Sequence, residues 1–454
     1  MLLISIIGIF VVDLQTMIFM IAVYLFGFAL LRLFNTKERI QTFKIYRILF
    51  LIGATYMIMC YTYMDYHNYE YLLAFDSYNF FIPRTEAYLE NGSYFKALKE
   101  VWLKYTFLDR FQSGYFTYAL LFAYIGKPFN LNFFVEQQIS VLFIYPFIGI
   151  LLYKLLRLNG FDSNKSYKYS LLICIFSVVF FYSTLVLRDL HILFLYLLAI
   201  YFSFNKVFSF FNLMKITIVA FICMTFRVES GLFLFVLIPT YLLLTLHNKR
   251  QRNLVIYISL FILIGLLSFS IAYYNQISSV FEANQENYIE GITEGSGVIS
   301  SLQRVPIAGD FASIIYNGVQ PLPFWSIFSS DLSRDLKYGG EVYNIMNFPK
   351  SISSFFNWFV IVYILFWLFS KGLRRKTKEY ISKPLQYQLW IGLVFLYMQS
   401  AVIAQRRLMA YYCMFYILFF IIYNHIGAKD KKQITITAIF SFIALQIIGL
   451  IYLS

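Results

Sequence analysis

Apolar runs of about 20 residues, the length that a transmembrane α-helix needs, recur from one end of this 454-residue sequence to the other. Charged residues make up 13% of the chain, whereas a soluble globular domain carries about 25%. No stretch has the composition of a separate soluble domain. We therefore expect an all-α, polytopic integral membrane protein, with residues 1–454 forming a single transmembrane domain.

The apolar runs predict about 12 membrane-spanning helices, and two of the segments that connect them are long. The first long segment covers residues 65–134, and the second covers residues 275–352. The apolar stretch 113–126 is short for a span, so we expect a short or re-entrant helix there, inside the first long segment. The predicted spans are 14–34, 48–64, 135–153, 169–186, 190–205, 214–227, 230–247, 254–274, 354–370, 385–403, 408–424 and 434–453.

Most of the 37 lysine and arginine residues lie in alternate connections between the predicted spans. The positive-inside rule assigns these connections to the cytoplasm. Both termini and both long segments are then expected on the outer side of the membrane. The net charge of +14 thus encodes topology, and we expect no nucleic-acid partner because no amphipathic basic face is present.

The cysteines give no sign of a disulfide framework or a metal site. Cys60, Cys174, Cys223 and Cys413 all fall inside apolar runs, without metal-ligand spacing. The four histidines are scattered, and only His191 stands near the charged residues described below. We expect neither a metal nor another cofactor. Residues 2–12 lack a basic n-region and a cleavage site, so we expect no cleavable signal peptide.

Three very short outer connections carry charged residues that apolar residues flank on both sides. A charge at this depth is costly unless it is paired or used. Any one pair, taken alone, is explained equally well as an interfacial anchor or as an ion pair that closes a short turn. All four basic residues are arginine, whose planar fork binds phosphate or carboxylate bidentately. We expect them to converge on an anionic ligand. The pairs are Arg188 with Asp189 in STLVLRDLHILF, Arg227 with Glu229 in CMTFRVESGLF, and Arg406 with Arg407 in AVIAQRRLMAYY.

The first long segment adds two further candidates. Asp76 and Arg84 lie in AFDSYNFFIPRTEAYLENGSY, where aromatic residues surround them. Sugars stack on aromatic rings, although solvated loop charges would look the same. A general base for a hydroxyl nucleophile could come from the carboxylates of the two long segments, Asp76 among them, or from Asp189 and Glu229.

The chain resembles the Wzy-type polysaccharide repeat-unit polymerases of bacterial O-antigen and capsule pathways. The resemblance covers the whole chain as architecture: about a dozen spans, a sequence rich in Phe and Tyr, and a large outer loop in the later half. That family has functional arginines in outer loops. The arginines that match them by position in the topology are Arg188, Arg227, Arg304, Arg406 and Arg407.

The resemblance implies a membrane glycosyltransferase that extends an undecaprenyl-diphosphate-linked glycan at the outer face of the bacterial cytoplasmic membrane. The implied partners are the undecaprenyl-diphosphate-linked oligosaccharide and membrane lipid, with a chain-length regulator protein as a candidate. Arginines would hold the diphosphate, and Asp189 or Glu229 would orient them or act as base. On this reading the catalytic residues are Arg227, Glu229, Arg188 and Asp189, and the substrate-binding residues are Arg406, Arg407, Arg304, Asp76 and Arg84.

A second resemblance is to the GT-C membrane glycosyltransferases, which use a polyprenyl-linked sugar donor. Their first outer loop carries an acidic residue, as Asp76 does in LAFDSYNFF, and a later acid follows near a span's outer end, as Asp189 does. Some members use a divalent metal, but this chain lacks a pair of acids at the start of the first outer loop. A transporter or flippase is less favoured, because the centres of the spans hold almost no charge and the two halves look unlike each other.

Overall fold

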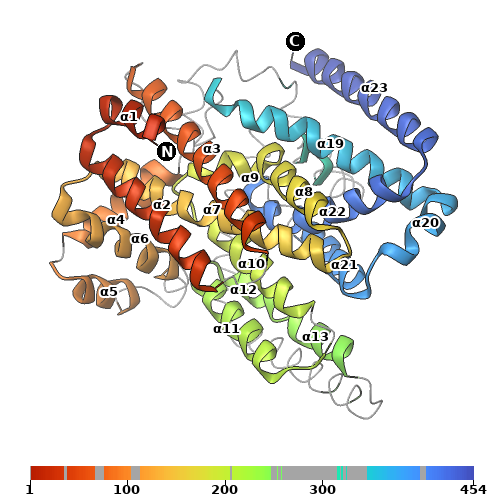
Figure 1. The fold of residues 1–454 in the computed structure, drawn as a ribbon, viewed down its shortest axis with the longest axis horizontal. Helices are drawn as coiled ribbons and strands as arrows, with labels where there is room; N and C mark the ends of the chain where they lie inside the picture. The colour runs from red at the N-terminus through yellow and green to blue at the C-terminus, as the bar shows by residue number, and fades with distance from the viewer. Residues whose placement is uncertain are drawn as a thin grey trace.

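The computed structural model is a bundle of helices, and no strand occurs among the residues that it describes (Figure 1). Helices satisfy their backbone hydrogen bonds internally, as the interior of a bilayer demands. The expected all-α class is therefore confirmed. The described residues are 2–34, 38–66, 76–90, 92–103, 113–204, 207–246, 253, 257, 314–316, 318–320, 324, 345–398 and 405–453.

Seven helical stretches in the described part of the chain are long and apolar enough to cross a membrane. They confirm a helical membrane protein, while the finer expectation of 12 spans is supported only in part. The seven are Leu14–Leu33 in α2 (Leu14–Phe34), α3 (Arg39–Tyr66), α7 (Phe133–Leu158), Val228–Thr245 with α12 (Val228–Leu234) and α13 (Leu237–Thr245), α19 (Phe348–Phe369), Leu408–His425 in α22 (Gln405–His425), and Ala428–Ile451 in α23 (Ala428–Leu453).

The predicted span 169–186 is bent. Helix α8 (Ser163–Phe176) meets the stretch Val178–Thr184, which contains α9 (Val178–Phe181), at 62°. The break lies at Ser177, whose hydroxyl accepts a hydrogen bond from the backbone N–H of Val179. The chain after this break stays buried up to Leu187. A broken helix at this depth is tolerated only where protein surrounds it or where it lines a cavity.

Three further predicted spans have weaker counterparts. The spans 190–205 and 214–227 correspond to α10 (Asp189–Ser203) and α11 (Phe210–Phe226), which are apolar but short. The span 385–403 corresponds in part to α21 (Lys383–Met398). The predicted span 254–274 falls almost wholly outside the described residues.

The first long segment folds into short helices that pack on the bundle. The stretch 113–126 is helical as expected, and this helix, α6, packs against α4, α5, α7 and α11. Its position relative to the bilayer stays a prediction. The elements here are η1 (Ser77–Phe81), α4 (Ile82–Leu89), α5 (Tyr94–Leu103), α6 (Ser113–Gly126) and η3 (Lys127–Phe129). The second long segment lies mostly outside the described residues; its described end includes η6 (Ile345–Asn347).

Helix α7 lies at the centre of the bundle, in contact with α3, α8 and α10 (Figure 1). The side chain of Asn132 caps its first turn by accepting from the Val135 N–H at 3.1 Å. Helices α19 and α23 pack together at the edge. Their outward side chains, such as Phe355 and Phe440, are large and exposed, as helices that face lipid require.

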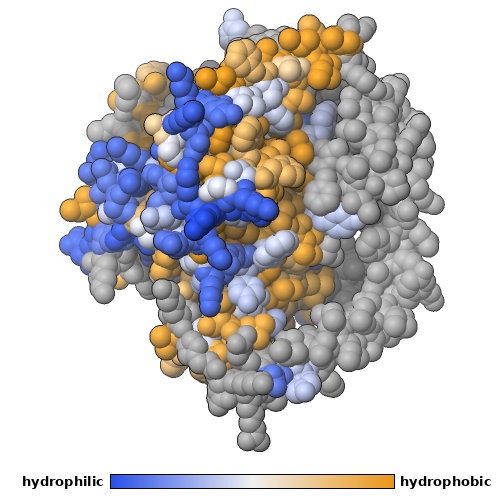
Figure 2. All heavy atoms as spheres, turned by 90° about the vertical axis from the view of Figure 1, so that its right-hand side faces the viewer, coloured by the Kyte–Doolittle hydropathy of each residue, from blue (hydrophilic) through white to orange (hydrophobic). Residues whose placement is uncertain are grey.

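One end of the bundle carries a set of exposed basic residues, which we call the basic rim. It comprises residues 157–165, α20 (Lys371–Thr377) with the η7 turn (Lys378–Tyr380), and residues 427–432. The Ser382 hydroxyl bonds Asn159 at 2.9 Å, and Lys376 pairs with Asp430 at 2.9 Å, so these parts lie together. On the face that carries α20, hydrophilic residues gather beside hydrophobic surface (Figure 2). The sequence predicts that this rim is cytoplasmic.

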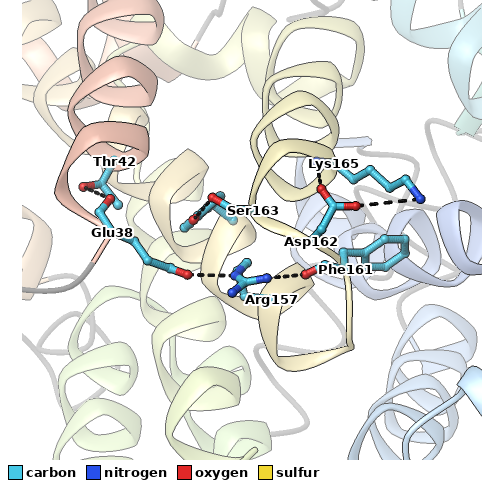
Figure 3. A network of polar contacts seen from close by, with 8 residues as sticks. Glu38, Thr42, Arg157, Phe161, Asp162, Ser163 and Lys165 are labelled. Atoms are coloured by element: carbon cyan, nitrogen blue, oxygen red, sulfur yellow. Dashed lines mark hydrogen bonds and ion pairs between the residues drawn. The ribbon is translucent and has the colours of Figure 1, made fainter.

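Figure 3 shows two ion pairs of this region, Arg157 with Glu38 and Lys165 with Asp162, whose side chains are all at least 35% exposed. Arg157 Nε is 2.8 Å from Glu38 Oε1, and the same guanidinium donates to the Phe161 carbonyl at 2.7 Å. Asp162 caps α8 by accepting from the backbone N–H of Lys165 at 2.8 Å. This hydrogen bond holds the pKa of the Asp162 carboxyl below its ordinary value. The rim therefore joins the ends of α3, α7 and α8.

Candidate functional site

Helix α10 begins at a buried carboxylate. Residues 185–188, between the bent span and α10, are not helical, and the Thr184 carbonyl just before them accepts from the Gln138 side chain at 3.1 Å. Asp189 is the first residue of α10 and is almost fully buried. A negative charge in the first turn is favoured by the helix dipole. Burial of this charge nonetheless requires a cationic partner.

Arg227 supplies that partner from the junction of α11 and α12. It is the single residue between the two helices, and its backbone is extended. Gly231 permits this tight connection, because a Cβ there would lie 2.4 Å from the backbone nitrogen of Met224. The buried Arg227 side chain places a terminal guanidinium nitrogen 2.7 Å from Asp189 Oδ1.

Glu229 contacts the same guanidinium from the surface side. Its Oε1 lies 3.5 Å from Arg227 Nε, and its side chain is 49% exposed. Nε itself makes no hydrogen bond with the described residues. The carboxylates of Asp189 and Glu229 both face the Arg227 guanidinium, so its charge is compensated where the side chain is buried. Arg227 thus stays cationic and keeps one donor available to a ligand.

Arg188 and Arg406 bring two more guanidinium groups to Asp189. Arg188 donates to the carbonyl of Phe226, the last residue of α11, at 3.0 Å and so ties the start of α10 to the end of α11. Arg406, the second residue of α22, is partly buried. The charges of Arg227, Arg406 and Arg188 all act favourably on the Asp189 carboxylate. Charges from three separate parts of the sequence therefore act on one carboxylate.

The first long segment reaches the same place through Asp76. A terminal nitrogen of Arg406 is 2.5 Å from Asp76 Oδ2, although the two residues are 330 positions apart in the sequence. A cation in the first turn of a helix opposes the helix dipole, so carboxylate partners offset that cost for Arg406. We call Asp76, Arg188, Asp189, Arg227, Glu229 and Arg406 the arginine cluster.

The other predicted site residues have different outcomes. Arg84 lies on α4 with its guanidinium over the rings of Phe80 and Phe116, at 5.0 and 5.6 Å from the ring centroids. The aromatic surroundings expected for it are present. Arg407 belongs to α22, but its side chain is outside the described residues, as is Arg304 entirely.

Tyr115, His191 and Phe226 pack together near Asp189, and we call them the aromatic floor; among them the sequence drew attention to His191. Tyr115 on α6 is fully buried, and its hydroxyl makes no hydrogen bond with the described residues. The imidazole of His191 lies 5.7 Å from the Tyr115 ring and stacks on Phe226 at 5.6 Å. The charge of Asp189 acts on both Tyr115 and His191. A tyrosine inside an apolar run looks like any core residue, so no sequence signal distinguished Tyr115.

An apolar pocket of about 680 Å³ lies between α8, α19, α22 and α23. Eight phenylalanines line it, among them Phe176, Phe355 and Phe442. Phe176 directly precedes the break at Ser177, from which the buried chain leads to Arg188. In a bilayer such a pocket has the chemistry to take a hydrocarbon chain.

Metal ligands do not gather in the described part of the chain: no three His, Cys, Asp or Glu side chains there form a group that could hold an ion. The expectation of a site without a metal stays a prediction. What the arginine cluster offers is three guanidinium groups, three carboxylates and a dry aromatic floor. This set suits the binding of an anion and the transfer of a proton.

Comparison of this chain with protein-family models, with curated proteins and with solved structures finds no match. The resemblances drawn from the sequence therefore stay expectations. The function has to be argued from the geometry of the arginine cluster and from the membrane character of the helices.

Proposed function

We propose that this protein is a membrane glycosyltransferase of the polysaccharide-polymerase type. In this proposal it moves a growing glycan from undecaprenyl diphosphate onto a lipid-linked repeat unit, at the outer face of a bacterial cytoplasmic membrane. One observation carries the proposal: Arg188, Arg227 and Arg406 come from three separate elements, and their charges act together on the buried carboxylate of Asp189, which Arg227 contacts directly. Preorganised guanidinium groups in a dry setting stabilise the charge of a leaving diphosphate.

The exposed carboxylates and the buried one have different roles in this proposal. Glu229 and Asp76 are 49% and 42% exposed, whereas Asp189 is 3% exposed. An incoming diphosphate displaces the two exposed carboxylates from Arg227 and Arg406, because it offers more charge and more acceptor oxygens. Asp189 stays in place and keeps Arg227 oriented. Ligand binding is thus an exchange of anions around fixed cations.

The displaced Glu229 is then placed to act as the general base. The acceptor hydroxyl attacks the anomeric carbon, and the bond from that carbon to the diphosphate oxygen breaks. The bonding electrons remain on the diphosphate, where the arginines stabilise them. The hydroxyl proton passes to Glu229 and then to water. The glycan leaves its carrier in the same step in which the new glycosidic bond forms.

The test is glycan length in a strain that lacks the chromosomal copy of this gene. A plasmid with the wild-type gene should restore polymer, whereas Arg227→Ala should leave single capped repeat units at an equal protein level in the membrane fraction. The matched control is Arg157→Ala, which removes an arginine with a 2.8 Å carboxylate partner at the basic rim. Full-length polymer from Arg227→Ala would refute the assignment.

The same strain separates the polymerase from a GT-C transferase or a ligase. Loss of a polymerase leaves single repeat units of complete composition. Loss of a GT-C transferase instead leaves repeat units that lack one side-branch sugar, and loss of a ligase leaves glycan that stays on its lipid carrier. Co-purification of a chain-length regulator would favour the polymerase.

Transport of a lipid-linked oligosaccharide is a second candidate function, favoured by the interrupted helices. The bend at Ser177 and the junction at Arg227 both lead to the arginine cluster. Transporters commonly build substrate sites at such breaks. A transporter defect would leave repeat units on the cytoplasmic leaflet, where an impermeant sugar-oxidising reagent cannot reach them. Reagent-accessible single units would exclude this alternative.

A further inference from the structure

Glu136 is a buried carboxyl outside the arginine cluster. It lies in the first turn of α7 and is 2% exposed. Its Oε1 atom has no hydrogen-bond partner, and the side chain takes part in no ion pair among the described residues. A carboxylate in such a place is unstable unless a cation neutralises it.

The surroundings of Glu136 increase the need for a cation. Its carboxyl packs on Gly126, the last residue of α6, where an added Cβ would lie 2.6 Å from the carboxyl carbon. The carboxyl end of α6 carries partial negative charge, which opposes the favourable partial positive charge of the first turn of α7, in which Glu136 lies. Lys127, the nearest basic residue in sequence, points elsewhere: its ammonium bonds the Leu89 carbonyl at 3.5 Å and lies 5.7 Å from the Tyr124 ring centroid.

We propose that Glu136 is a cation-binding site, which holds one small monovalent cation, a proton or a sodium ion, against the carboxyl end of α6. The glycine at 126 gives the carboxyl group access to that helix end. A cation removes the repulsion between the Glu136 carboxylate and the last carbonyls of α6.

Helix α6 gives this site a route to the arginine cluster. One end of α6 contacts Glu136 at Gly126, and the other end carries Tyr115, which packs on His191 beside Asp189. Between them, the Tyr118 hydroxyl bonds the Ser140 carbonyl of α7 at 2.6 Å. Loss of the cation would push α6 away from α7 and disturb the floor beneath Asp189. Binding or loss of the cation would thus change how α6 packs against α7.

The test is labelling of the full-length protein, in detergent at neutral pH, with dicyclohexylcarbodiimide, which reacts with protonated carboxyl groups in apolar surroundings. Peptide mass spectrometry should find the adduct on Glu136 and none at the same peptide of Glu136→Gln. An adduct that sodium chloride suppresses, relative to potassium chloride, identifies a sodium site. An adduct that is equal in both salts identifies a proton site.

Thermal unfolding provides the second measurement. Gln has the shape of a neutral Glu, so Glu136→Gln should unfold at or above the wild-type temperature, and sodium should no longer shift that temperature. The matched control is Glu90→Gln, which changes an exposed carboxyl near the same helices. Absence of the Glu136 adduct in both salts, or a lower unfolding temperature of Glu136→Gln than of wild type, would overturn the proposal.

Discussion

Two arginine–carboxylate pairs, one in the basic rim and one in the arginine cluster, have nearly the same length and opposite settings. Arg157 and Glu38 are 2.8 Å apart, with side chains 37% and 35% exposed. Arg227 and Asp189 are 2.7 Å apart, with side chains 7% and 3% exposed. Water and salt screen the first pair, whereas the second lies where each charge depends on the other. The burial of an ion pair, and not the distance between its atoms, therefore distinguishes a pair of the functional site from a pair that only marks membrane topology.

The largest expected effect is on activity at Arg227. If the arginine cluster binds a leaving diphosphate, Arg227→Ala should lower the rate of chain extension by about 100- to 1000-fold, as loss of a preorganised transition-state donor does. Polymer yield per amount of membrane protein measures it. A loss of equal size in Arg157→Ala would erase the distinction between the two pairs.

The second-largest expected effect is on the free energy of unfolding, which should depend on the buried pair more than on the exposed one. Asp189→Ala leaves the Arg227 charge buried without its main partner and should cost about 3–5 kcal/mol. The free energy of unfolding in detergent, from the midpoint of a denaturation curve, measures this cost. Asp189→Leu combined with Arg227→Leu should recover much of the loss, because neither charge then remains buried. Strict additivity of the two single changes would contradict a direct pair.

A smaller effect is expected at Arg406, which is only partly buried. Arg406→Lys keeps the charge but loses the planar fork, so one charge-assisted hydrogen bond to Asp76 or to a ligand is lost. Such a bond contributes about 1.5 kcal/mol, which corresponds to roughly a tenfold loss of activity. Chain-extension rates of Arg406→Lys and wild type test this value. Unchanged activity would place Arg406 outside the ligand contacts.

The basic rim should show the smallest effects. Arg157→Ala should change the free energy of unfolding by only about 0–1 kcal/mol, as exposed pairs do, and the change should shrink at high salt. Unfolding curves at low and high sodium chloride measure both. A cost as large as that of Asp189→Ala would show that the rim is more than a topology signal.

The helix cap at Asp162, in the basic rim, gives a test of the role of exposed charges through its pH dependence. The Lys165 N–H holds the pKa of Asp162 below its ordinary value of 3.8, so the charged cap stabilises α8 above that pH. Its contribution is lost as the pH falls through the lowered pKa. Asp162→Ala should therefore lower the unfolding temperature slightly at pH 7, and the difference from wild type should vanish in acid. A difference that persists in acid would mean that the cap does not depend on charge.

The sequence predicted much of the arginine cluster because charges in very short apolar connections are conspicuous. Arg188 and Arg227 stand out in this way, and both lie at Asp189. The pairing of Asp76 with Arg406 could not be foreseen, since 330 residues separate them and only packing brings them together. Glu136 was overlooked for the opposite reason: a single carboxyl at the edge of an apolar run looks like an ordinary helix end.

The fold was predictable as a class and less so in its spans. Apolar length predicted α3, α7 and α23, each of which runs as one helix in the structure, although α7 contains Pro146 in its interior. The run around Ser177 stays apolar through the bend, so its 62° break leaves no trace in hydropathy. A serine that bonds a neighbouring backbone N–H can end a helix locally, but the same residue is common inside helices.

Helices α10 and α11 have a mechanical consequence for the surrounding lipid. With 15 and 17 residues, at 1.5 Å per residue they measure about 22 and 26 Å, and a bilayer's hydrocarbon layer is roughly 30 Å thick. No side chain of α10 is exposed, but lipid beside the exposed face of α11 must compress to avoid exposing its chains. This local thinning of the bilayer would bring the lipid headgroups closer to Arg188 and Arg227. A lipid-linked ligand that diffuses laterally in the membrane would then reach the arginine cluster with its headgroup already at the right depth.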